Sequence, residues 1–193
     1  MNPVAARIVE RRVVAILRCA EPARVGAAVI EGGVDVVEVP LNVPGALDAI
    51  SSLSAIPGAL VGAGTVMSAA DARAALDAGA RFLLSPVLVP EVVTAAHAAG
   101  AAAVPGAFTP TELDACTRMG ADLVKLFPAD RLTPADLRTL LAALPGARLL
   151  PTGGITTANA GEWLAAGAVA VGVGGALTRE PERAPELLAA LAS

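Results

Sequence analysis

The stretch PTELDACTRMGADLVKLFPA, residues 110–129, shows the pattern that decides the fold. Pro110 follows a threonine, which is typical of a helix N-cap and first turn, and the expected helix runs over 110–119. Gly120 follows the end of that helix, and the apolar run at 123–127 is typical of a buried strand. One helix and one strand thus occupy about twenty residues, and similar units precede and follow this one along the chain.

Apolar runs and alanine-rich stretches alternate throughout the sequence. The expected strands lie at 13–17, 36–41, 60–64, 82–86, 102–106, 123–127, 149–153 and 169–173. The expected helices lie at 22–31, 45–54, 69–78, 90–99, 110–119, 134–143, 157–166 and 183–192. Such alternation requires parallel strands joined by right-handed crossovers. We therefore predict an α/β protein, a single-domain (β/α)8 TIM barrel over residues 1–193.

An open, doubly wound sheet is the alternative arrangement of the same units. That fold carries a glycine-rich nucleotide-binding fingerprint after its first strand. The corresponding stretch, ILRCAEPARVG at 16–26, has no such fingerprint. The sequence therefore favours the barrel.

Composition excludes several classes of protein. The net charge is -4, and no basic cluster exists beyond Arg11 and Arg12, which argues against a nucleic acid partner. No apolar run reaches the ~18 residues of a membrane span, and the first residues lack the apolar region of a secretion signal. Cys19 and Cys116 form neither a metal-ligand spacing nor a disulfide framework. We expect a cytoplasmic protein with no membrane partner.

Lys125 is the only lysine in the chain, and every other basic residue is an arginine. Alternation along a barrel strand places Lys125 on the same side as Leu123, and it places Glu38 on the same side as Val36. A charge aimed outward would be buried against helices at high cost. Both side chains are therefore expected in the lumen, facing each other, near the carboxyl-terminal mouth where barrel enzymes place their chemistry.

Two interpretations of this pair are open. In the first, Lys125 and Glu38 form a buried ion pair, although arginine would serve an ion pair better and such a pair gains little over apolar residues. In the second, Lys125 is a nucleophile, because a desolvated lysine loses its proton near neutral pH and its amine attacks a carbonyl carbon. The position of the single lysine within an apolar strand favours a Schiff-base residue.

The ends of other strands supply further candidates. Arg18 ends the first strand and offers a guanidinium to a carboxylate, Thr65 follows the third strand, and Pro86 closes the fourth. Two glycine pairs, Gly153 with Gly154 and Gly174 with Gly175, follow the last two strands, where barrel enzymes commonly bind phosphate through backbone N–H groups. The alternative for these glycines is that they only permit tight turns.

No metal or cofactor is expected. His97 is the only histidine and falls within the helix at 90–99, so it has no second histidine to complete a ligand set. The same placement argues against a Ser-His-Asp or Cys-His arrangement. We expect His97 to be a surface or packing residue.

Seven segments in order, VVAILR, GGVDVVEVPLN, GAGTV, SP, PGAFTPTE, VKLFPA and PTGGI, resemble the 2-keto-3-deoxy-6-phosphogluconate (KDPG) and 4-hydroxy-2-oxoglutarate aldolases. The resemblance covers about residues 13–177. It implies a class I aldolase on a (β/α)8 barrel that is homotrimeric and independent of metal. It also implies Lys125 as the Schiff-base residue and Glu38 as the general acid/base. The substrate-binding positions that the motifs imply are Thr65, Phe127, Thr152, Gly153 and Gly154.

The reaction implied by this resemblance is cleavage of KDPG to pyruvate and glyceraldehyde 3-phosphate, with 4-hydroxy-2-oxoglutarate, which gives pyruvate and glyoxylate, as a second substrate. Asn42 stands where many gluconate-type members have arginine, and together with Arg18 it resembles the 2-keto-3-deoxy-6-phosphogalactonate aldolases. Thr152 instead resembles the gluconate type, and Ala176 replaces a serine that contacts phosphate in some members. The alternatives from other classes are a phosphosugar epimerase or isomerase and a non-catalytic sugar-phosphate binding barrel.

Overall fold

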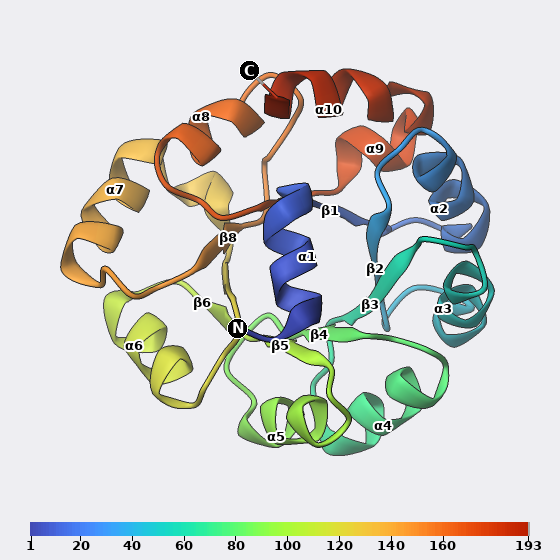
Figure 1. Cartoon of the computed structure of the whole chain (residues 1–193), viewed down its shortest axis with the longest axis horizontal. Helices are drawn as coiled ribbons and strands as arrows, with labels where there is room; N and C mark the ends of the chain where they lie inside the picture. Colours follow the sequence, from blue (N-terminus) through green and yellow to red (C-terminus); the bar gives the residue numbers. More distant parts are fainter. Residues whose placement is uncertain (193) are drawn as a thin grey trace.

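The computed structural model describes residues 1–192, and within this range it contains nine strands and ten α-helices (Figure 1). The strands are β1 (Val13–Ile16), β2 (Val36–Pro40), β3 (Leu60–Gly64), β4 (Phe82–Leu84), β5 (Ala102–Val104), β6 (Gly106–Ala107), β7 (Val124–Leu126), β8 (Leu149–Pro151) and β9 (Val171–Val173). The helices are α1 (Pro3–Arg11), α2 (Pro22–Glu31), α3 (Ala46–Ser54), α4 (Ala69–Asp77), α5 (Pro90–Ala98), α6 (Pro110–Arg118), α7 (Pro134–Ala143), α8 (Ala160–Ala165), α9 (Gly175–Arg179) and α10 (Ala184–Ala192). The predicted domain ends at Ser193, which lies outside the described residues.

All strand pairs are parallel, and they form two sheets in the described chain. The larger sheet has the order β5-β4-β3-β2-β1-β9, and the smaller has the order β6-β7-β8. This arrangement confirms the α/β class with parallel strands. It differs from the prediction of one continuous eight-stranded barrel, because the strands fall into a six-stranded curved sheet and a three-stranded one.

The predicted strand at 102–106 is divided into β5 and β6 at Pro105. Proline has no N–H to donate to a neighbouring strand, so the ladder is interrupted there. Several other strands are shorter than predicted, and β4 ends at Leu84 where the sequence suggested a strand to residue 86. The helix predicted at 157–166 begins only at Ala160, since the backbone N–H of Thr156 donates to Asn159 Oδ1 and holds this segment in a turn.

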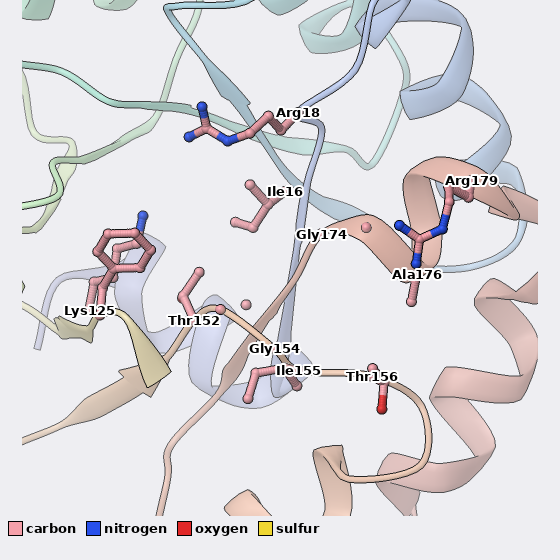
Figure 2. Close-up of a pocket in the computed structure, with 14 residues that line it drawn as sticks. Ile16, Arg18, Lys125, Thr152, Gly154, Ile155, Thr156, Gly174, Ala176 and Arg179 are labelled. Carbon is pink, nitrogen blue, oxygen red and sulfur yellow. The ribbon is translucent and has the colours of Figure 1, made fainter. Parts of the chain in front are cut away.

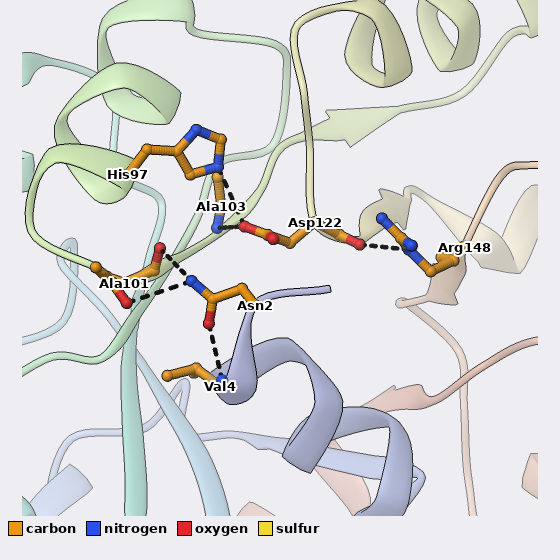
Figure 3. Close-up of polar contacts among 8 residues, drawn as sticks. Asn2, Val4, His97, Ala101, Ala103, Asp122 and Arg148 are labelled. Carbon is orange, nitrogen blue, oxygen red and sulfur yellow. Dashed lines mark hydrogen bonds and ion pairs between the residues drawn. The ribbon is translucent and has the colours of Figure 1, made fainter.

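Helix α1 was not predicted from the sequence, and it lies across the middle of the ring of strands (Figure 1). Asn2 begins it by accepting a hydrogen bond from Val4 N–H at 2.8 Å, with proline at the first helical position. The Asn2 side chain also donates to the carbonyls of Gly100 and Ala101, as Figure 3 shows. The same side chain therefore caps α1 and ties it to the segment before β5.

The buried apolar residues form two clusters, one inside the ring of strands and one between strands and outer helices. The inner cluster contains Leu123 and Val36, together with Ile8 from α1. Val37 and Leu126, which are their alternating neighbours, belong to the outer cluster. Side chains alternate between faces along a strand, so this division places residues 38 and 125 on the inner face.

His97 lies on α5 and its side chain is 40% exposed, as expected for a surface residue. Its Nε2 is 3.2 Å from Asp122 Oδ2, which also accepts a hydrogen bond from Ala103 N–H (Figure 3). Among residues 1–192, no group of three or more His, Cys, Asp or Glu side chains is arranged to hold a metal ion. Within the same residues, no helix is both long enough and apolar enough to cross a membrane.

Candidate active site

A cavity of about 500 Å³ opens at the carboxyl ends of the strands (Figure 2). Its size falls within the usual range for small-molecule sites. Eight of the sequence-predicted site residues line it: Arg18, Lys125, Phe127, Thr152, Gly153, Gly154, Gly174 and Gly175. These residues come from β1, β7, β8 and β9 and the segments after them, so the cavity collects residues that are far apart in the sequence.

Lys125 stands on β7 and lines this cavity, and the residue is 4% exposed. Its Nζ lies 4.8 Å from the centre of the Phe127 ring. Burial lowers the pKa of Lys125, and the positive charge of Arg18 acts in the same direction, whereas Glu38 opposes it. Desolvation thus favours the neutral amine, which is the nucleophilic form of a lysine.

Glu38 lies on β2 and is 1% exposed. Both of its carboxylate oxygens are buried and have no hydrogen-bond partner among the described protein groups, so Glu38 and Lys125 do not form a hydrogen-bonded ion pair. Burial raises the pKa of Glu38 to about 7, although the charges of Lys125 and Arg18 act to lower it. A carboxyl group with this pKa can both accept and donate a proton near neutral pH.

The β3 strand makes room for this carboxyl group. A Cβ atom at Gly64 would overlap Glu38 Oε1, so a side chain at position 64 would displace the carboxylate. A similar relation holds at Gly172 on β9, where a Cβ would overlap Thr152 Oγ1. The glycines of these strands are therefore required by close approach of polar side chains in the interior.

Arg18 follows β1 and is held by two neighbours at the mouth. Its Nη1 donates to Asn42 Oδ1 at 2.9 Å, and its Nη2 donates to Thr65 Oγ1 at 3.3 Å. Thr65 has a positive φ of 56°, which is uncommon for a β-branched residue and is a form of strain found at functional sites. The structure thus brings together Arg18 and Thr65, two residues that the sequence suggested for substrate binding.

Three of the predicted site residues, Glu38, Thr65 and Pro86, do not line the larger cavity. Pro86 borders a separate cavity of about 110 Å³, which Phe127 also lines. Conversely, Arg179 on α9 lines the larger cavity, and sequence reasoning missed it. Helix α9 was not expected, and an arginine beyond a glycine pair gives no periodic signal that would point it toward a site.

The fold and this site define a class: a parallel-stranded α/β protein with a buried lysine and a buried, unpaired carboxyl group within its strands. The model of the KDPG and KHG aldolase family matches residues 4–185. The chain belongs to this family. It is therefore an aldolase, that is, a carbon-carbon lyase.

Relatives with different substrates in their names resemble the chain. A probable 2-dehydro-3-deoxy-6-phosphogalactonate aldolase of Rhizobium meliloti is 37% identical over 174 residues, which cover 87% of this chain and 82% of that protein. The structure of the 2-keto-3-deoxy-6-phosphogluconate aldolase of Zymomonas mobilis with 3-phosphoglycerate matches with a TM-score of 0.85 and 30% identity, over 98% of this chain and 96% of that one.

A KDPG aldolase of Legionella pneumophila, with pyruvate captured as a covalent carbinolamine intermediate, also has a similar structure. It matches with a TM-score of 0.82 and 28% identity, over 98% of this chain and 97% of that one. The relatives thus carry both gluconate-type and galactonate-type names, and they agree on the aldolase family.

Proposed function

We propose that this protein is a class I aldolase that cleaves KDPG to pyruvate and glyceraldehyde 3-phosphate through a Schiff base on Lys125. Cleavage of 4-hydroxy-2-oxoglutarate to pyruvate and glyoxylate is the second reaction that we propose. The observation that carries the proposal is the burial of the chain's only lysine in the wall of a cavity, where it interacts electrostatically with Glu38. Glu38 is also buried, and its carboxylate has no hydrogen-bond partner among the described residues. The covalent pyruvate intermediate of the Legionella relative supports the same chemistry.

The reaction begins with the neutral amine of Lys125, whose pKa is lowered by burial. The amine attacks the C2 ketone, and loss of water gives an iminium that accepts electrons. Glu38 removes the proton of the C4 hydroxyl, the C3–C4 bond breaks, and the aldehyde leaves. The electron pair of that bond forms an enamine, which Glu38 protonates at C3 before water releases pyruvate and free Lys125. One acid/base group with a pKa of about 7 can serve both proton transfers.

The charged ends of the substrate have candidate partners along the cavity. Arg18 and Thr65 lie together at the mouth and suit the carboxylate beside C2. Gly153 and Gly154 follow β8 and line the same cavity, with positive φ values of 105° and 70°. Such glycine-rich segments suit phosphate binding through backbone N–H groups. These contacts would position the reacting atoms beside Lys125.

We also propose that the two sheets belong to one (β/α)8 barrel domain over residues 1–193. An isolated parallel bridge between Thr152 and Gly172 joins the β8 and β9 sides, which supports closure at one seam. At the other seam, β5 and β6 follow each other directly around Pro105. A homotrimeric assembly in the cytoplasm follows from the family resemblance, and light scattering after size exclusion would test the trimer.

Galactonate-type cleavage is a second candidate, and one contact favours it. Asn42 accepts a hydrogen bond from Arg18, so the residue that departs from the gluconate type holds the proposed carboxylate-binding arginine. Cleavage rates for KDPG, its galactonate epimer at C4 and the unphosphorylated gluconate substrate distinguish the candidates. The preferred substrate is the one with the highest kcat/KM.

The covalent step is tested by incubating the protein with pyruvate and borohydride and mapping the mass increase. Because Lys125 is the only lysine in the sequence, a peptide map separates trapping at Lys125 from trapping at a terminal amine. A pyruvate-derived increase on Lys125 is expected. If the folded protein shows no mass increase at saturating pyruvate, the Schiff-base mechanism is contradicted. Turnover with proton exchange but no covalent adduct would then indicate an epimerase or isomerase.

Lys125→Arg provides the matched variant. Arginine keeps a positive charge and a long side chain but does not lose its proton in this range. We expect the variant to fold and to lose turnover and trapping. Retained turnover would exclude the covalent mechanism.

A further inference from the structure

Arg179 is the last residue of α9, and its side chain lines the same cavity as Lys125. Figure 2 shows the two residues at opposite sides of the site, with Arg179 beside Ala176 and Lys125 nearer to Arg18. A Cβ atom at Gly175 would lie 2.9 Å from Arg179 Nη1. The guanidinium is therefore placed against the backbone of the glycine pair that follows β9.

The guanidinium of Arg179 has no charged partner among residues 1–192. In the described part of the chain, the side chain of Arg179 also has no hydrogen-bond partner. Its acidic neighbour Glu180 is instead bound to Arg183 at 3.0 Å, and Glu186 binds the same Arg183 at 2.9 Å. Arg183 is therefore held between two carboxylates, whereas Arg179, four residues earlier, faces the cavity.

The cavity end around Arg179 otherwise has few side-chain donors. Gly174 and Gly175 offer backbone only, Ala176 carries no hydroxyl, and Thr156 contributes a hydroxyl but no charge (Figure 2). Three basic side chains line the cavity, and the other two, Arg18 and Lys125, lie toward its other end (Figure 2). A phosphate carries about two negative charges at neutral pH, so backbone N–H groups alone would leave it without a counter-charge here.

We infer that Arg179 binds the phosphate of the substrate and determines the preference of this aldolase for a phosphorylated keto acid. This inference rests on the proposed function. A guanidinium donates two parallel hydrogen bonds to phosphate oxygens and also neutralises part of the phosphate charge. Backbone N–H groups add hydrogen bonds but carry no such charge. Arg179 then supplies the side-chain contact that Ala176 lacks, and it does so from outside the reacting centre.

The test compares two substrates that differ only in phosphate, KDPG and 2-keto-3-deoxygluconate, in wild type and Arg179→Ala. A hydrogen bond to a charged group contributes enough that its loss should raise KM for KDPG by roughly 10- to 100-fold. The KM for 2-keto-3-deoxygluconate should stay unchanged. Arg179→Lys should recover part of the effect on KDPG, because it restores the charge without the paired donors.

Arg183→Ala is the matched control, since it removes an arginine that already has two carboxylate partners. It should leave the ratio of the two KM values as in wild type. An equal change for both substrates in Arg179→Ala, or no change for either, overturns the inference. Arg179→Gln is a second variant that also removes the charge. Circular dichroism checks that each variant is folded.

Pyruvate trapping on Lys125 separates this inference from the proposed function, because pyruvate carries no phosphate. Trapping should be the same in wild type and Arg179→Ala. Absence of trapping in wild type would contradict the proposed function alone. In that case, the affinity for inorganic phosphate is measured by calorimetry in wild type and Arg179→Ala. Weaker binding to the variant supports the role of Arg179 in phosphate binding, and equal binding overturns it.

Discussion

Replacing Glu38 with glutamine tests the electrostatic state of the site without removing its shape. Glu38 is 1% exposed, and neither oxygen has a hydrogen-bond partner among the described groups. Burial raises its pKa from 4.5 to about 7 in the folded protein. Glutamine keeps nearly the same volume and cannot ionise, so the difference between the two proteins reports the titration of Glu38, together with the effect of its charge on the pKa of Lys125.

The direction in which stability changes with pH follows from proton binding. Between pH 4.5 and 7 the folded protein holds a proton on Glu38 that the unfolded chain has released, so the folded state binds more protons. The contribution of Glu38 to the free energy of unfolding is fully present below pH 4.5 and is lost as pH rises through 7. One pKa unit corresponds to about 1.4 kcal/mol, which makes the total loss about 3 kcal/mol.

The assay is urea unfolding of wild type and Glu38→Gln at several pH values from 4 to 8, at one protein concentration. We expect the free energy of unfolding of wild type, relative to the variant, to fall with rising pH. Glu91→Gln, an exposed residue at the start of α5, controls for loss of a carboxylate as such. A flat difference, or a wild type that gains stability as pH rises, would refute the reasoning and favour an ionised Glu38 paired with Lys125.

Three further predictions concern the packing of the site and of the interior. Gly64→Ala should destabilise the protein by about 1–3 kcal/mol and slow pyruvate trapping, because its Cβ would overlap the Glu38 carboxylate; unchanged urea unfolding would contradict this. Asn42→Ala should raise KM for keto acid substrates roughly tenfold with little change in kcat, since Arg18 loses its 2.9 Å hydrogen bond, and Asn42→Asp should recover the wild-type KM. Ile8→Ala should lower the free energy of unfolding by about 2–5 kcal/mol, and a negligible change would show that α1 does not pack on the interior.

The sequence determined the α/β class and most of the elements because their signals are local. Proline after threonine, glycine after a helix and short apolar runs place α6 and α7 and the strands beside them within a few residues. Alternation along a strand is equally local, and it was sufficient to place Lys125 and Glu38 on the inner face. The ordered motifs were sufficient to indicate the aldolase family.

Tertiary structure decided the features that depend on distant residues. The burial of Ile8 on the inner cluster gives α1 a role at the interior that its sequence alone did not indicate. The missing hydrogen bond of Glu38 and the contact of Arg18 with Asn42 arise between different strands and loops. The place of Arg179 likewise depends on how α9 packs beside β1 and on the space left by Gly175. Local sequence signals do not encode these contacts. The desolvation of a side chain and its contacts depend on which distant segments the folded chain brings together.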